Sequence, residues 1–234
     1  MTDMLDSHPA VASYEELLLP AEHHRQTWGR SDREFFHEYY ARRVGCRRWP
    51  LATPFLMRYL EELYAPRPAI AAIGMKLMYS QLKQYPWLLA YMVLRRVRVV
   101  HLVRSNLLDV VVSQETAQAR RQYHAYASEA VDHSAVDLRT EQLVPQLEGL
   151  QRSVDRIRLL LRLLPAPSIE ISYEELGRGD DTLAAVFDFL GVAPRRVTSR
   201  FAKLNRDPKH VLIANYPDVE RTLRGTPFER FLAD

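Results

Sequence analysis

The amino-acid sequence predicts an α/β fold with a central parallel sheet flanked by helices. Short apolar runs rich in β-branched residues alternate with longer segments in which apolar residues recur at helical spacing. The clearest run is VRVVHLV at 97–103, which is followed by helical periodicity up to residue 120. Strands that alternate with helices pair in parallel, and parallel sheets are buried on both faces.

The other elements follow from periodicity, capping residues and prolines. Further helices are predicted at 1–5, 32–43, 53–63, 80–94 with an interruption at Pro86, 140–164, 183–190 and 217–223. Convincing strands number only three, at 69–75, 97–103 and 168–173, which is few for a doubly wound sheet. We expect polar surface segments at 124–138 and, around the last helix, at 197–234.

Composition and charge narrow the class of protein. The chain has 234 residues, 32 Lys and Arg and 29 Asp and Glu, and its net charge of +3 suits a small anionic ligand. It lacks the clustered basic stripe of a nucleic-acid-binding protein. Cys46 is the only cysteine, no apolar run approaches the roughly 20 residues of a membrane span, and the first residues do not resemble a signal peptide. We therefore expect a cytoplasmic protein without a nucleic-acid partner or a membrane span.

A candidate anion site lies where the run 97–103 ends. Arg104 follows the run directly, and Ser113 lies about two and a half turns into the next helix. In open α/β sheets, ligands bind beyond the carboxyl ends of the strands. A guanidinium fork and a hydroxyl that face the same crevice suit a phosphate group. Lys76 follows the run 69–75 in the same way.

Five segments also resemble a known family. In chain order they are DSHPAVASYEEL, IGMKLMYSQL, HLVRSNLLDVVVSQ, ISYEEL and the tail KLNRDPKHVLIANYPDVERTLRGTPFERFL. Each is similar to a segment of the bacterial-type sulfotransferases that use 3′-phosphoadenosine 5′-phosphosulfate (PAPS). The resemblance implies one sulfotransferase-like domain over residues 1–234, a three-layer P-loop-like fold, and PAPS as the sulfuryl donor.

The resemblance also implies roles for particular residues. Arg104 and Ser113 would bind the 3′-phosphate of the nucleotide, and Tyr173 would pack against its adenine. From the tail, the cations Lys203, Arg206 and Lys209 would cover the 3′-phosphate, and the resemblance does not fix which of them does so.

The catalytic groups implied by the resemblance lie in the first third of the chain. Lys76 would lie near the transferred group as a point charge. Glu16, with Glu15 beside it, matches the position of the family's catalytic base. His8 is a second candidate for the base, although a histidine before proline at a helix end is more often structural.

One part of the family pattern is missing from this sequence. The family begins with a strand and a loop of the type Arg-Ser-Gly-Ser-Thr, whose backbone amides hold the 5′-phosphosulfate. The sequence has no such loop, so we expect it to be N-terminally truncated relative to the family. Either its start was assigned too late and the true protein is longer, or the protein is a degenerate form. The absent strand would be a central one. We expect this chain alone to bind adenosine 3′,5′-bisphosphate (PAP) weakly and to turn over poorly or not at all.

These observations support three functional hypotheses. The first is a sulfotransferase that moves a sulfuryl group from PAPS to a hydroxyl, or an amine, of a small molecule or glycan. This activity would require the missing loop to be restored, and we expect no metal cofactor. The alternative is a non-catalytic relic that binds nucleotide or pairs with a partner subunit, for example as a homodimer, because a missing strand leaves apolar edges. The third is a P-loop kinase relative, which would not depend on a 3′-phosphate.

Overall fold

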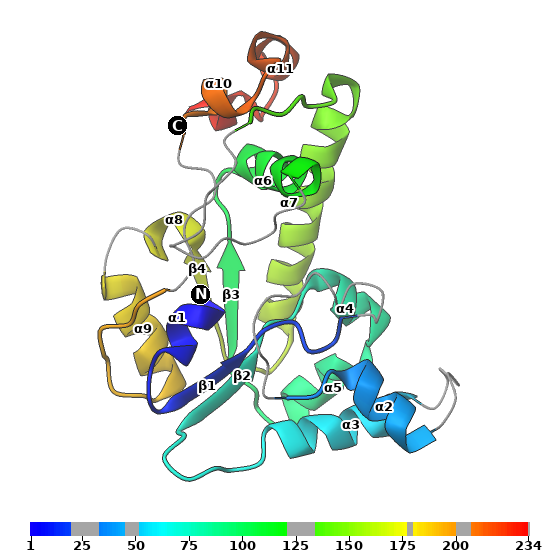
Figure 1. Ribbon diagram of the computed structural model, residues 1–234, viewed down its shortest axis with the longest axis vertical. Coiled ribbons are helices and arrows are strands. Elements are labelled where there is room, and N and C mark those ends of the chain that lie inside the picture. The colour runs from blue at the N-terminus through cyan, green and yellow to red at the C-terminus, as the bar shows by residue number, and fades with distance from the viewer. Residues whose placement is uncertain (20–32, 45–51, 121–133, 177–179, 200–206, 234) are drawn as a thin grey trace. The chain divides into compact units, whose positions relative to one another are not determined.

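The computed structural model describes residues 1–19, 33–44, 52–120, 134–176, 180–199 and 207–233 (Figure 1). Contacts between residues divide the chain into two compact units. Unit 1 comprises residues 1–101, 163–170 and 178–199, and unit 2 comprises residues 102–162, 171–177 and 200–234. Each unit is described by itself below.

The predicted helices are present with small shifts at their ends. Those of the first half are α1 (Thr2–Asp6), α2 (Phe36–Val44), α3 (Ala52–Leu63), α4 (Tyr79–Gln84), α5 (Trp87–Leu94) and α6 (Leu107–Arg120). The predicted helices of the second half are α7 (Thr140–Leu163), α9 (Asp180–Leu190) and α11 (Tyr216–Leu223). Within the described residues, the structure adds three short helices that were not predicted, α8 (Tyr173–Leu176), α10 (Lys209–Leu212) and a 3₁₀ helix (Glu229–Leu232). The predicted interruption at Pro86 separates α4 from α5, and Gly191, with φ of +71°, follows the end of α9.

The described residues contain four strands rather than the three that were predicted. The additional strand is β1 (Val11–Tyr14), which pairs in parallel with β2 (Ala72–Met75), from Val11 opposite Ala72 to Tyr14 opposite Met75. The sequence VASY is short and has a single β-branched residue, so it carries little strand signal. Strand β2 begins three residues later than predicted, because Ala69 has a φ of +63°, which is incompatible with a strand.

Strands β3 (Val99–Val103) and β4 (Ser168–Ser172) form a second pair. The α/β class is therefore confirmed, and the parallel pairing is confirmed for β1 and β2. Among the described residues the strands form two two-stranded sheets and not one continuous sheet. The single central sheet of a three-layer fold stays a prediction.

The core of unit 1 is rich in aromatic side chains from α2, α3 and the α4–α5 connection. Phe36 contacts the rings of Tyr40, Tyr59 and Tyr85, with centroid distances of 5.5–6.1 Å. The Tyr59 hydroxyl donates a hydrogen bond to the Glu34 carbonyl at 2.7 Å, and burial raises the pKa of Tyr59 well above its usual value. These aromatic residues therefore form packed core.

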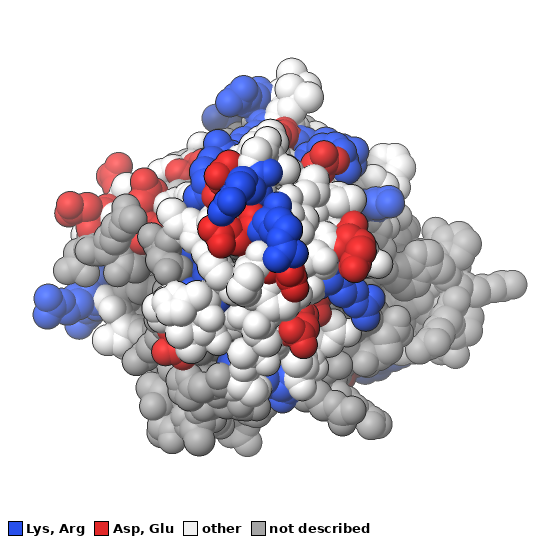
Figure 2. Space-filling view, turned by 90° about the horizontal axis from the view of Figure 1, so that it is seen from above, with Lys and Arg blue, Asp and Glu red and all other residues white. Residues whose placement is uncertain are grey.

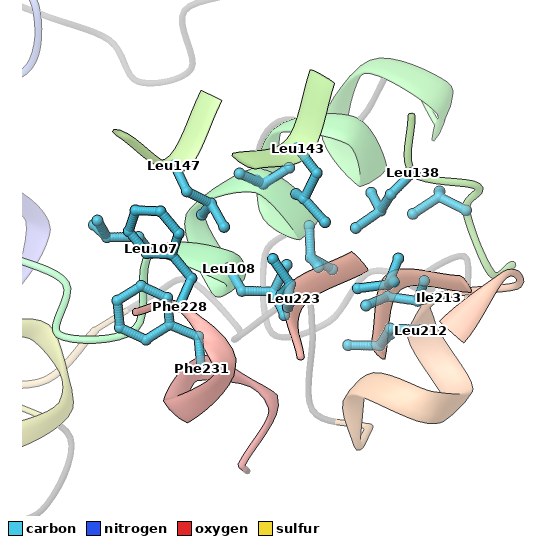
Figure 3. Packing of buried hydrophobic residues seen from close by; sticks show 14 residues of the cluster. Leu107, Leu108, Leu138, Leu143, Leu147, Leu212, Ile213, Leu223, Phe228 and Phe231 are labelled. Carbon is cyan, nitrogen blue, oxygen red and sulfur yellow. The ribbon is translucent and has the colours of Figure 1, made fainter. Parts of the chain in front are cut away.

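The core of unit 2 joins α6 and α7 to the C-terminal tail. Figure 3 shows leucine side chains of α6 and α7 pointing toward side chains of the tail. In the described part of the tail, the buried apolar residues are Leu212, Ile213, Val219, Leu223, Phe228 and Phe231. The expectation of a polar, irregular tail was wrong for residues 208–232, because apolar residues at helical spacing in α11 and around the 3₁₀ helix fill this core.

The described surface carries both signs of charge. In the view of Figure 2, acidic and basic side chains are intermingled. Several form exposed pairs one helical turn apart, such as Arg221 with Asp218 at 2.8 Å and Arg224 with Glu220 at 3.2 Å. Of the helices described, none is both long enough and apolar enough to cross a membrane.

Candidate functional site

Two predicted catalytic residues meet where β1 and β2 end. The backbone N–H of Lys76 donates to the Tyr14 carbonyl at 2.8 Å, so the parallel pairing continues one residue past β2. Glu16 follows β1 by two residues, and its carboxylate lies 2.5 Å from the Lys76 ammonium. The Glu16 side chain is 17% exposed and that of Lys76 is 37% exposed. The sequence placed these residues separately, and the parallel pairing brings them into an ion pair.

The other two candidates of this region have partners of their own. Glu15 accepts a hydrogen bond from the Thr2 hydroxyl. His8 is 5% exposed, and its ring lies 5.1 Å from that of Phe187. Its Nδ1 accepts the Ala10 N–H at 3.1 Å, so its Nε2 carries the proton and donates to the Ala193 carbonyl at 3.1 Å. With both ring nitrogens bound to backbone, the geometry favours the structural role for His8.

Two residues predicted to hold the same nucleotide contact each other in unit 2. Arg104 follows β3, and Tyr173 is the first residue of α8, directly after β4. The Arg104 guanidinium carbon lies 4.3 Å from the centre of the Tyr173 ring. Arg104 Nη1 also donates to the Asp109 carbonyl at 3.1 Å. The guanidinium is therefore held between an aromatic face and the first turn of α6.

Ser113 lies one turn further along the same helix. In α6 the N–H of Ser113 points to the carbonyl of Asp109, the group that also binds Arg104. Helical side chains lean toward the N-terminus of the helix, so we expect the Ser113 hydroxyl to lie over the turn to which Arg104 binds. The Ser113 side chain is half-buried.

The start of α6 is capped by two polar side chains. Asn106 Oδ1 accepts the backbone N–H of Leu108 at 3.1 Å and that of Asp109 at 3.4 Å. Both carboxylate oxygens of Glu174 lie 3.1 Å from the Ser105 N–H. Partial burial raises the pKa of Glu174, but the backbone donors outweigh it and hold the pKa below its usual range.

Lys209 is the predicted tail cation that the structure describes, since Lys203 and Arg206 lie outside the described residues. It is 6% exposed, and its ammonium donates to the Ala233 carbonyl at 2.7 Å and lies 3.4 Å from the Asp109 carboxylate. Lys209 thus connects α10, α6 and the C-terminal residues. The sequence predicted a cation over the phosphate and did not reveal this internal partner.

Sequence reasoning missed Glu174 and Asp109 as members of this region. Glu174 lies in the quoted segment ISYEEL, and the acidic residue next to Tyr173 was the available signal. Asp109 lies in the first turn of α6, where an acidic residue is common for helix stability alone. Across the described ranges, no group of three or more His, Cys, Asp or Glu side chains is placed to hold a metal ion.

Comparison with known proteins identifies the family. The model of the sulfotransferase family matches residues 1–195. No curated protein and no solved structure matches the sequence. The matched residues include the Glu16–Lys76 pair and the Arg104–Tyr173 contact, and they cover most of the chain. The chain therefore belongs to the sulfotransferase family.

Proposed function

We propose that this protein transfers a sulfuryl group from PAPS to a hydroxyl, or an amine, of a small molecule or glycan. The family match supports sulfuryl transfer. The observation that carries the choice of PAPS is the contact of 4.3 Å between Arg104 and Tyr173. The resemblance assigns one of these residues to the 3′-phosphate and the other to the adenine of a single nucleotide. Residues that serve one nucleotide must lie within reach of it together.

The nucleotide would be recognised mainly through the 3′-phosphate. Arginine carries five N–H donors, and the bond to the Asp109 carbonyl fixes the plane of the guanidinium while other donors face the phosphate. The Ser113 hydroxyl over the same turn supplies a further donor. Because Arg104 covers one face of the Tyr173 ring, the adenine packs against the other face or against the ring edge.

The transfer step would use the Glu16–Lys76 pair. Glu16 takes the proton of the acceptor hydroxyl as its oxygen forms a bond to sulfur. The bond between sulfur and the bridging oxygen of the 5′-phosphate breaks, and Lys76 stabilises the charge that develops there. At 2.5 Å the pair is closed, so each side chain must release the other before it can act.

The two units would be parts of one sulfotransferase domain, because the family match runs through both of them. We also place the protein in the cytoplasm, because its single cysteine suits a reducing compartment.

Calorimetric titration with PAP and with adenosine 5′-monophosphate tests nucleotide recognition. We expect PAP to bind weakly but more tightly than the monophosphate, because only PAP carries the 3′-phosphate. Arg104→Gln should abolish this preference, and Arg152→Gln, which removes an exposed guanidinium on α7, should preserve it. Equal affinities of the wild-type chain for the two nucleotides would refute the assignment of Arg104. A third titration, with ATP, tests the kinase relative, which would be favoured if ATP bound more tightly than PAP.

The two separate strand pairs favour a second candidate, a non-catalytic relic that pairs with a partner subunit. Each two-stranded sheet has edges that are unpaired within the described residues, and such edges recruit further strands. Size-exclusion chromatography with light scattering distinguishes the two functions. A well-behaved monomer that binds PAP argues against a relic that pairs with a partner subunit, whereas a stable dimer that ignores PAP supports it.

A further inference from the structure

Three polar side chains of unit 1 form a hydrogen-bonded row. Tyr79 is the first residue of α4, His101 lies within β3, and Glu170 lies within β4. The Tyr79 hydroxyl is 2.6 Å from His101 Nε2, and His101 Nδ1 is 3.0 Å from a carboxylate oxygen of Glu170. Both nitrogens of one imidazole are therefore engaged by side chains from two other elements.

The row fixes the tautomer of the histidine. An ionised carboxylate only accepts hydrogen bonds, so Nδ1 of the neutral ring carries the proton. Nε2 is then a lone-pair acceptor, and the Tyr79 hydroxyl donates to it. This is the order of a nucleophile, a base and an orienting carboxylate that activates hydroxyl groups in enzymes.

The surroundings suit an activated group better than a packing contact. His101 is 5% exposed and stands in a strand whose other residues are Val99, Val100, Leu102 and Val103. An apolar side chain would fill this position without requiring hydrogen-bond partners. Glu170 is 41% exposed and Tyr79 is half-buried, so the buried base connects two groups that reach the surface.

We infer that Tyr79 is a nucleophilic phenol, activated by His101 and positioned through Glu170, which takes up a group from electrophilic sulfur(VI) compounds. The Tyr79 oxygen forms a bond to sulfur while its proton passes to His101 Nε2. The bond from sulfur to the leaving group breaks, and that group departs with the electron pair. Glu170 stabilises the resulting imidazolium, which returns its proton to water. That the natural donor is a sulfuryl compound rests on the proposed function; the activation of Tyr79 does not.

Chemical labelling of the full chain with benzenesulfonyl fluoride tests the inference, with fluoride as the leaving group. Peptide mapping by mass spectrometry compares the labelling rates of Tyr79 and Tyr216. Tyr216 is a matched comparator, because it is also half-buried and its ring lies 6.4 Å from that of His210, but its hydroxyl is 3.5 Å from a backbone carbonyl. General-base assistance is typically worth about 100-fold or more, and we expect Tyr79 to react faster by this order.

Substitution of the carboxylate separates activation from packing. In Glu170→Gln the side-chain amide can donate to Nδ1, which moves the ring proton to Nε2 and removes the acceptor for Tyr79. The Tyr79 rate should fall to that of Tyr216, and Glu170→Asp should restore part of it. Glu148→Gln, a change at a carboxylate that is 50% exposed, should leave the rate unchanged.

Nitrogen NMR of the histidines gives a readout without labelling. Wild-type His101 should carry its proton on Nδ1, and Glu170→Gln should reverse this. Equal labelling rates for Tyr79 and Tyr216, or an unchanged Tyr79 rate in Glu170→Gln, would overturn the inference. Because the labelling needs no nucleotide, failure of PAP binding would reject the proposed function and leave this result standing.

Discussion

Replacement of Lys209 by methionine measures how strongly the C-terminal residues are held. Methionine keeps most of the apolar stem but removes the ammonium, which lies 2.7 Å from the Ala233 carbonyl and 3.4 Å from the Asp109 carboxylate. A hydrogen bond from a charged donor contributes about 1.5–3 kcal/mol. The ion pair adds little, because the Asp109 side chain is 41% exposed and water can replace the lost cation. Removing the buried charge recovers part of the desolvation cost, so we expect a net loss of about 2 kcal/mol.

Urea unfolding followed by circular dichroism measures this loss. Lys83→Met is the matched control, because Lys83 is exposed on α4, and it should change the free energy of unfolding by less than about 0.5 kcal/mol. Asp109→Asn should cost less than about 1 kcal/mol, since it removes only the weaker of the two contacts. If Lys209→Met were as stable as Lys83→Met, or if Asp109→Asn cost as much as Lys209→Met, the bond from Lys209 to the Ala233 carbonyl would not be the main contact that holds the C-terminal residues.

Two further substitutions test local features of the structure. Gly191→Ala should lower the free energy of unfolding by about 1–2 kcal/mol, because the φ of residue 191 is +71° and the new Cβ would lie 3.3 Å from Arg98 Nη1. Gly149→Ala, at a mid-helix position with open space around the new Cβ, should be neutral or stabilising. Thermal unfolding of the two variants compares them. Glu174→Gln should be less stable than wild type at pH values above roughly 4.3, the pKa of glutamate in the unfolded chain. As the pH falls through the lower pKa of Glu174 in the folded protein, the two stabilities should become equal. Unfolding at several pH values measures this difference. A difference that persisted at low pH would contradict the role of the Glu174 charge.

The helices could be predicted because their signals are local. Apolar periodicity and proline positions depend on neighbours within a few turns, and α3, α5 and α7 begin and end close to the predicted residues. Strand β1 escaped because its stability comes from pairing with β2, far along the chain, and four residues of VASY carry almost no local preference. The start of α2 shifted for the same kind of reason, since the Phe36 N–H bonds to the Leu17 carbonyl.

The site could be predicted as a set of residue types but not as a set of contacts. Arg104 and Lys76 were visible because a cation directly after an apolar run is conspicuous. Their contacts with Asp109 and Glu16 were not visible, because Asp109 offers a backbone carbonyl and Glu16 follows a different strand. Backbone acceptors carry no sequence signal, and partners supplied by other elements depend on the folded register.

In the described structure, the cations predicted to bind the sulfuryl donor are already engaged by groups of the protein. Lys76 is paired with Glu16, Arg104 lies against Tyr173, and Lys209 is bound by a carbonyl and a carboxylate. An incoming anion must therefore replace existing contacts. Its affinity reflects only the difference in free energy between its own contacts with these cations and the internal contacts that it replaces. A phosphate group with up to two charges and three acceptor oxygens replaces them more effectively than a singly charged anion. Under the proposed function, the same competition makes weak binding of PAP the expected behaviour of this chain. It also predicts that recognition depends on the 3′-phosphate rather than on the adenine.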